Sequence, residues 1–327
     1  MISSINASDS RDVLTLVLVG IPGLEHIYPW ILVSFCFLYV ISLIGNSILF
    51  FIIKTDTFLQ TPMYDLVSRL ALTDLGLSLV TLPTVLGVFC LQSLRLSVPC
   101  CLLQMFFVHC LSVIESSVLL TMAYDRFVAI CNPLRYSSLL TRPLTSRLGL
   151  FSVLRGVAVI LPIPLMLRCS SLCKSSILSH AFCLHPDVMR LLCSHMSVNN
   201  LYSIFAVLST MGLDAVFITL SYVFILRAVC GLGSSSERCK AFHRCACHIS
   251  VVLLFYSPMI SLSMIHRFGG HKTRFPHVVL AYLHFLLPPA LNPILYGVNS
   301  KCIYQRLVHR IQHIRLDKVK KPQDNVQ

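Results

Sequence analysis

The segment that most constrains the architecture is residues 27–53, which reads IYPWILVSFCFLYVISLIGNSILFFII and contains no Asp, Glu, Lys or Arg. An α-helix needs about 20 consecutive apolar residues to cross the hydrocarbon core of a bilayer. This run of 27 residues is therefore long enough to span a membrane. It predicts a first membrane-spanning helix close to the N-terminus.

Six further apolar stretches follow this segment. Residues 277–300 also contain no Asp, Glu, Lys or Arg. The others, some with one to three ionisable groups, are residues 63–92, 101–122, 148–167, 201–226 and 249–265. The pattern predicts an all-α integral membrane protein with a seven-helix transmembrane bundle at 27–298. An extracellular tail (1–26) would precede it, and an amphipathic helix with a basic cytoplasmic tail (299–327) would follow.

The composition agrees with a protein whose surface faces lipid. The chain is 56% hydrophobic and 12% charged, whereas a soluble protein needs roughly 25% charged residues. Residues 1–27 lack the basic start, apolar stretch and cleavage site of a signal peptide. Asn6-Ala7-Ser8 is a glycosylation acceptor, which fits an N-terminus outside the cell.

The distribution of positive charge sets the orientation. With the N-terminus outside, sixteen Lys and Arg residues fall in inner segments and eight in outer segments. This asymmetry follows the positive-inside rule and supports a multi-pass membrane protein with its N-terminus outside. Topology and attraction to anionic inner-leaflet lipid therefore account for the net charge of +13, with no need for nucleic acid.

Cysteines are informative where they lie outside the apolar runs. The outer loop between the fourth and fifth spans holds Cys169, Cys173, Cys183 and Cys193 in an oxidising compartment. A disulfide from Cys100 or Cys101, at the outer end of the third span, would fix this loop as a lid over the bundle. The sequence does not give the pairing.

A second group of cysteines lies at the predicted inner end of the sixth span. It comprises Cys239, Cys245 and Cys247, with His243 and His248 nearby. Their spacing fits no closed tetrahedral zinc site, so free thiols are expected and no metal is predicted there.

Ionisable residues inside the spans are informative because each is costly in lipid. Asp74 lies in the middle of the second span and Glu115 in the middle of the third. The two carboxylates could hold a cation such as sodium or share a proton; alternatively, they belong to a neutral hydrogen-bonded core. Glu115 and Arg126 are eleven residues apart, about three helical turns, so they lie on one face.

Two other charged positions stand out. Asp65 and Arg69 are four residues apart with the acid first, which predicts a helical ion pair of structural importance. Arg155 in the fourth span has no obvious partner in the sequence.

Several motifs along the chain resemble one known family. Residues 122–134, MAYDRFVAICNPL, closely resemble the signature at the end of the third span of the olfactory receptors, which are rhodopsin-like G-protein-coupled receptors. Further matches are Gly45-Asn46, Pro62-Met63-Tyr64, residues 70–75, Ser221-Tyr222, Lys240-Ala241-Phe242 and residues 292–296. In this order across seven spans the motifs are highly specific.

Two motifs resemble the class I, or fish-like, subset of this family. They are Ile21-Pro22-Gly23-Leu24-Glu25 near the N-terminus and His266-Arg267-Phe268-Gly269 after the sixth span. That subset is associated with carboxylic acids and other polar odorants. The resemblance thus implies a receptor for odorants, and not an enzyme.

The resemblance also assigns roles to individual residues. It implies that Asp125 and Arg126 form the latch that opens a cleft for the G protein, and that Asn292, Pro293 and Tyr296 form a switch in the seventh span. It implies the disulfides Cys101–Cys183 and Cys173–Cys193, leaving Cys100 and Cys169 unassigned.

The chain departs from the family pattern at three places. Phe127 stands where the family has Tyr, and the basic pair His243-Arg244 begins a segment that usually reads Ser-Thr-Cys-x-Ser-His. Asp65 and Arg69 occupy positions that are ordinarily uncharged. These changes leave the fold intact and bear on the efficiency of signalling.

The ligand site is expected in the outer half of the bundle. Ser263 and Arg267 are four residues apart near the outer end of the sixth span, and His109 lies one to two turns inside the third. A guanidinium offers a planar charged fork suited to a carboxylate, and Val108 and Val113 would contact the hydrocarbon tail. Alternatively, Arg267 extends to the lipid headgroups or pairs with Asp187 in the outer loop.

The expected mechanism is a shift between two receptor states. An odorant anion that bridges the third and sixth spans would favour their active arrangement and expose the region of Arg126 to a G protein. By resemblance the partner is a heterotrimeric G protein of the stimulatory, olfactory type, which raises cyclic AMP. No cofactor is expected beyond a sodium ion.

The sequence disfavours two other classes of function. A secondary transporter would show related halves with broken helices, and no internal repeat is evident. An intramembrane enzyme would need a third group beside Asp74 and Glu115. Within the receptor class, the alternative is expression outside the nose with a metabolite or steroid-like ligand.

Overall fold

The computed structural model describes residues 15–21, 23–168, 177–178, 180–191, 197–231, 234–268, 274–299 and 302–310, without the side chains of 197, 240, 244, 266–268, 274, 275, 298 and 299. Within these residues, seven helical segments are long and apolar enough to cross a membrane. The predicted seven-span helical fold is therefore confirmed. Asn6, Cys169, Cys173 and Cys193 lie outside the described residues.

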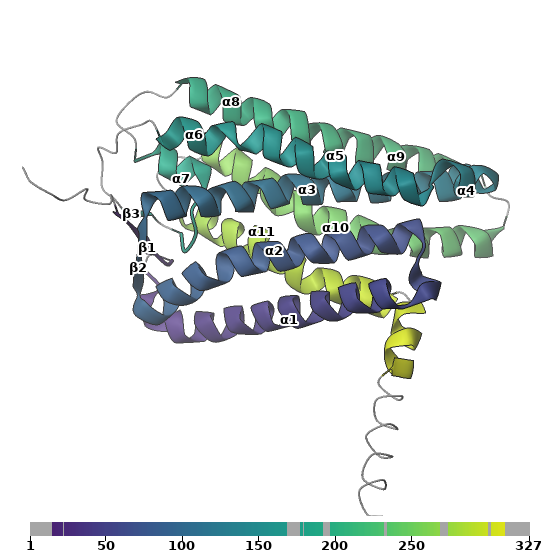
Figure 1. Cartoon of the computed structure of the whole chain (residues 1–327), viewed down its shortest axis with the longest axis horizontal. Helices are drawn as coiled ribbons and strands as arrows, with labels where there is room; N and C mark the ends of the chain where they lie inside the picture. The colour runs from purple at the N-terminus through teal and green to yellow at the C-terminus, as the bar shows by residue number, and fades with distance from the viewer. Residues whose placement is uncertain are drawn as a thin grey trace, which may run out of the picture.

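The spans run roughly parallel to one another (Figure 1). They comprise α1 (Tyr28–Thr55), α2 (Pro62–Leu91), α3 (Val98–Cys131), α5 (Arg142–Ile160) continued by α6 (Pro162–Arg168), α8 (Ser197–Val207) continued by α9 (Leu213–Cys230), α10 (Ser235–Phe268) and α11 (Arg274–Asn299). A π-helical segment, Leu208–Gly212, joins α8 to α9. Short helices α4 (Tyr136–Leu139) and α7 (His185–Met189) lie at opposite ends of the bundle.

Local sequence explains where several helices begin. Proline occupies the first turn of α1, α2, α3 and α5, where its missing N–H costs nothing. Some helices extend well beyond the apolar runs: α10 begins at Ser235, not at residue 249. The inner turns of such a helix lie in water, so they need helix-forming residues but not apolar ones.

A close contact between α1 and α11 depends on small and polar residues of α1. A Cβ at position 45 would lie 2.9 Å from Cβ of Pro293, so Gly45 is required for this approach. Pro293 has no N–H, which leaves the carbonyl of Pro289 without its helical donor. Asn46 Nδ2 donates to that carbonyl at 2.8 Å. The Gly45-Asn46 pair thus stabilises α11 at its proline.

The prediction of an entirely α-helical protein missed a small sheet at the outer end. Its strands β1 (Thr15–Val19), β2 (Ser93–Ser97) and β3 (Ile177–Leu178) are ordered β2-β1-β3 (Figure 1). β1 is antiparallel to β2 and parallel to β3. Leu16 and Leu18 of β1 are buried. Strands of two to five residues carry too little periodicity to be recognised alone.

The outer loop is attached to the bundle as a lid. We use this term for residues 177–191, of which 179 is outside the described residues. A disulfide joins Cys101 to Cys183, the pair that the family resemblance implies. The Cys183 N–H donates to Gln104 Oε1 at 3.0 Å, and the Ala181 N–H donates to the Tyr282 hydroxyl at 3.1 Å. The lid is therefore held by both α3 and α11, and Cys100 is an exposed free thiol.

At the inner end, residues 302–310 form a short helix that turns away from the bundle (Figure 1). Arg306 packs over the ring of Phe58 at 4.2 Å, and its Nε lies 3.7 Å from Asp56 Oδ2. These contacts hold the helix against the loop after α1. Residues 311–327 lie outside the described residues.

Candidate functional site

The residues predicted to bind a ligand are only partly brought together. His109 is half-buried on α3, and its Nε2 accepts a hydrogen bond of 3.4 Å from the N–H of His185 in the lid. Val108 and Val113 are buried on the same helix. Ser263 is half-buried on α10, and the side chain of Arg267, one turn further, is outside the described residues.

Two hollows lie elsewhere on the surface. One of about 210 Å³ at the inner end is lined by residues that include Lys54, Asp65 and Arg142. The other, of about 310 Å³, lies between α1 and α11 beside Trp30 and Tyr282. Neither contains His109, so neither corresponds to the predicted ligand site.

Arg155, for which the sequence suggested no partner, forms a buried ion pair with Asp214 of α9. Arg155 Nη1 lies 2.9 Å from Oδ1 of Asp214. The same guanidinium donates to the Ser117 hydroxyl and to the carbonyl of Ser209, each at 3.1 Å. Ser209 belongs to the π-helical segment, where the regular helical hydrogen bonds are interrupted.

A hydroxyl group extends this network to two further helices. Ser116 of α3 donates to Asp214 Oδ2 at 2.8 Å, and its hydroxyl lies 2.7 Å from that of Tyr256 on α10. Four spans thus meet at one polar centre: α3, α5, α9 and α10. We call Arg155, Asp214, Ser116, Ser117 and Tyr256 the central network.

The two carboxylates singled out from the sequence lie deep in the bundle. Asp74 and Glu115 are 0% and 2% exposed, and their carboxyl groups are close enough to interact electrostatically. Asn292 Nδ2 donates to Asp74 Oδ2 at 3.0 Å. Within the described part of the chain, Asp74 Oδ1 and Glu115 Oε1 are buried with no hydrogen-bond partner.

The inner end of α3 holds the predicted latch. Arg126 Nη2 lies 3.2 Å from Asp125 Oδ2, and the Tyr136 hydroxyl donates to Asp125 Oδ1 at 2.7 Å. Burial, with the hydrogen bond to Asp125, raises the pKa of Tyr136 above its ordinary value. Tyr136 therefore stays a neutral donor that holds the acid against Arg126. Phe127 packs edge-on against Phe224 of α9.

The switch residues of α11 face α2 and α3. Asn292 contacts Asp74, and the Tyr296 hydroxyl lies 3.9 Å from the sulfur of Met122, one turn above Arg126. Cys247 of α10 donates to the carbonyl of Leu295 at 3.3 Å. The switch is thus in contact with both α3 and α10.

The charged pair on α2 forms as the spacing predicts. Arg69 Nε lies 2.9 Å from Asp65 Oδ2, and Lys54 adds a contact of 2.7 Å to Oδ1. A Cβ at position 149 would clash with the guanidinium of Arg69. The absence of a side chain at Gly149 therefore leaves space for the guanidinium of Arg69 against α5.

Sequence reasoning missed several residues that the structure brings into these sites. Asp214, Ser116 and Tyr256 complete the network around Arg155, and Gln104 anchors the lid. A usable signal existed for one of them. Arg155 requires a partner in the bundle, and Asp214 is the acid in the span that follows.

Comparison with known proteins places this geometry in a family. The family model described as olfactory receptor matches residues 35–314. Olfactory receptor 51G2 of Homo sapiens is 49% identical over 308 residues, which cover 94% of this chain and 98% of that protein. Olfactory receptor 51E2 of Rattus norvegicus is 44% identical over 90% of this chain and 92% of that protein.

The fold has a solved counterpart. The structure is similar to squid rhodopsin with a TM-score of 0.71 at 16% identity, covering 89% of this chain and 87% of that chain. At this level of identity the likeness supports the fold alone. The sequence relatives carry the family assignment: the chain belongs to the olfactory receptor family, and it is a multi-pass plasma-membrane signalling receptor and not an enzyme.

Proposed function

We propose that this receptor binds a small carboxylic acid between α3 and α10, beneath the lid, and raises cyclic AMP through a stimulatory G protein. Its family implies a small-molecule ligand and a G protein as partners. The observation that carries the site is the contact between His109 and the lid at His185. It puts a polar side chain of α3 at the boundary between bundle and lid.

Arg267 is the proposed partner of the acid. It stands one turn beyond Ser263 on α10, and a guanidinium can bind a carboxylate through two parallel hydrogen bonds. The alternative partner for Arg267 was Asp187. That carboxylate already has His180 Nδ1 at 2.9 Å and Arg190 at 4.0 Å, which favours the ligand role.

The signal would pass through contacts that link α3 to α10. The Ser116 and Tyr256 hydroxyls join the helices at mid-depth. Nearer the inner face, Tyr222 of α9 bonds to His248 of α10 at 2.5 Å. A ligand that draws the outer ends of α3 and α10 together would favour a different arrangement of their inner ends. In that arrangement Arg126 is released from Asp125.

We also propose that Asp74 and Glu115 hold a sodium ion in the resting state. Oxygen atoms are the donors that a hard cation prefers. Both residues are buried, and each offers an oxygen without a hydrogen bond among the described residues. A shared proton is the competing arrangement, and sodium dependence distinguishes the two.

The test of the ligand site measures cyclic AMP in cells that express the receptor. A panel of aliphatic acids is compared with the matching methyl esters, for wild type and for Arg267→Ala. Arg168→Ala is the matched control, because Arg168 is an exposed arginine at the outer end of another span. Surface staining is recorded for every variant.

We expect acids to activate wild type and Arg168→Ala, esters to be inactive, and surface-expressed Arg267→Ala to be silent. Equal responses to esters, or a normal response of Arg267→Ala, would remove the acid from the proposal. Activation by acids without cyclic AMP would leave the ligand site standing and replace the G protein.

A further inference from the structure

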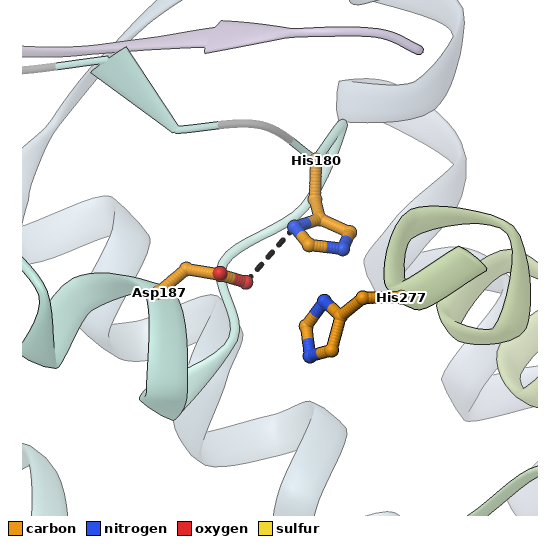
Figure 2. Close-up of side chains that lie close together, drawn as sticks. All are labelled: His180, Asp187 and His277. Atoms are coloured by element: carbon orange, nitrogen blue, oxygen red, sulfur yellow. Dashed lines mark ion pairs between the residues drawn. The ribbon is translucent and has the colours of Figure 1, made fainter. Parts of the chain in front are cut away.

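Two histidines and one carboxylate converge at the outer end of the bundle. Figure 2 shows His180 of the lid, Asp187 of α7 and His277 of α11 with their side chains directed toward one another. One ligand atom from each residue lies within 4.8 Å of the other two. His277 is far in the sequence from the two lid residues, so the fold creates this cluster.

The cluster is buried and rich in donors. His180, Asp187 and His277 are 1%, 7% and 4% exposed. His180 Nδ1 lies 2.9 Å from Asp187 Oδ2, without the alignment of a hydrogen bond, and both His180 nitrogens lack a hydrogen-bond partner in the described part of the chain. Buried polar atoms are ordinarily satisfied. The unpaired nitrogens of His180 are therefore candidates for binding a ligand.

The surroundings of Asp187 suit this interpretation. Arg190 lies 4.0 Å from Oδ1, which leaves Oδ2 directed toward the histidines.

We propose that His180, Asp187 and His277 form a zinc site that connects the lid to α11. Two imidazole nitrogens and one carboxylate oxygen are typical zinc ligands, with water in the fourth position. Calcium and magnesium are disfavoured because both prefer oxygen ligands. Ligand atoms around zinc stand roughly 3.4 Å apart, given metal–ligand distances near 2.1 Å. The three ligand atoms now lie within 4.8 Å of one another, so zinc binding would require them to adopt that separation.

The site has a structural consequence. The disulfide between Cys183 and Cys101 already attaches the lid to α3, three residues after His180. Zinc would add a second attachment, to the outer end of α11. Extracellular zinc would then restrict the lid, whatever ligand the receptor recognises.

The test uses the full-length receptor, purified and with free thiols blocked by N-ethylmaleimide, so that the cysteines cannot bind metal. Zinc binding is measured by titration calorimetry. We expect one zinc ion per wild-type receptor. His180→Ala and His277→Ala should each weaken zinc binding at least ~10–100-fold. Mutation of residues that only hydrogen-bond to metal ligands already lowers metal affinity by that factor.

Two other buried histidines provide matched controls. His185 lies in the same lid, and His284 lies two turns deeper on α11. His185→Ala and His284→Ala should bind zinc like wild type. If they lose binding as fully as the cluster variants do, or if wild type takes up no zinc, the proposal is overturned.

A measurement on wild type avoids any variant that does not fold. X-ray absorption spectroscopy at the zinc edge of the zinc-loaded receptor should show nitrogen and oxygen atoms around the metal, including two imidazoles. Sulfur neighbours, or a single imidazole, would contradict the assigned ligands. Neither measurement depends on an odorant, so failure of the proposed acid site leaves this test unaffected.

Discussion

Two acidic sites lie at mid-depth in this bundle, and they are satisfied in opposite ways. Asp214 has a complete set of partners: Arg155 contacts it at 2.9 Å and Ser116 donates to it at 2.8 Å. Asp74 and Glu115 have one donor between them among the described residues, the amide of Asn292, and each retains an oxygen without a partner.

The difference separates a permanent joint from an exchangeable one. A buried carboxylate beside an arginine needs nothing from outside, and its helices are held at fixed positions. Two neighbouring carboxylates without an arginine need a cation or a proton, whose presence depends on conditions. The second site can therefore respond to the supply of a cation or proton, whereas the first pairs its charges without one.

The largest effect is expected at Arg155. Arg155→Ala leaves the Asp214 charge buried without its partner, which should lower the free energy of unfolding by about 3–5 kcal/mol. Thermal unfolding of the purified receptor measures this. The double variant Arg155→Leu, Asp214→Leu should recover most of the loss, and a double variant as unstable as the single one would contradict a simple charge pairing.

A smaller loss is expected at Ser116. Ser116→Ala removes a hydrogen bond to a charged acceptor, which should cost about 1.5–3 kcal/mol of unfolding free energy. Ser112→Ala is the control, because Ser112 is buried on the same helix and, among the described residues, its hydroxyl is hydrogen-bonded only to the carbonyl of Val108. If the two variants have equal stability, the hydrogen bond from Ser116 to Asp214 contributes no more to the unfolding free energy than that of Ser112.

The stability contributed by Asp74 should depend on sodium, unlike that of the central network. In sodium chloride the unfolding midpoint of wild type should exceed that in choline chloride by about 2–4 °C, as expected for an ion that binds only the folded state. Asp74→Asn should abolish the difference with little loss of stability in choline. Equal sodium stabilisation of this variant would assign the ion to another place.

The smallest effect is expected at the inner surface. Lys54 contacts Asp65 at 2.7 Å, but its side chain is 45% exposed. An ion pair in contact with water contributes about 0–1 kcal/mol, so Lys54→Ala should leave the unfolding midpoint almost unchanged at 150 mM salt. A loss comparable to that of Arg155→Ala would mean that exposure does not distinguish the two pairs.

The membrane explains why the spans could be predicted from the sequence. Lipid demands about 20 apolar residues in succession, which is a local property that residues 27–53 display in full. The pair Asp65–Arg69 was predictable for a similar reason, since four residues make one helical turn. The motif residues Asp125, Arg126 and Asn292 were identified by family resemblance.

Contacts between distant segments could not be predicted in this way. Arg155 of α5 contacts Asp214 of α9, and His180 lies close to His277 although almost 100 residues separate them in the sequence. No periodicity encodes these pairings, because packing of the whole bundle decides them. The ligand site stays a prediction at Ser263 and Arg267, for which sequence supplies spacing but not the shape of a cavity.

The strand order at the outer end has a consequence for biosynthesis. β1 ends at Val19, but its parallel partner β3 ends at Leu178. At roughly 5–20 residues per second, the ribosome takes about 8–32 s to synthesise the chain between them. Leu16 and Leu18 thus emerge among the first residues into the lumen of the endoplasmic reticulum and wait through four helix insertions for their neighbour. An epitope tag that interrupts residues 15–19 would therefore disturb a pairing made after the first four spans, although it is placed near the beginning of the chain.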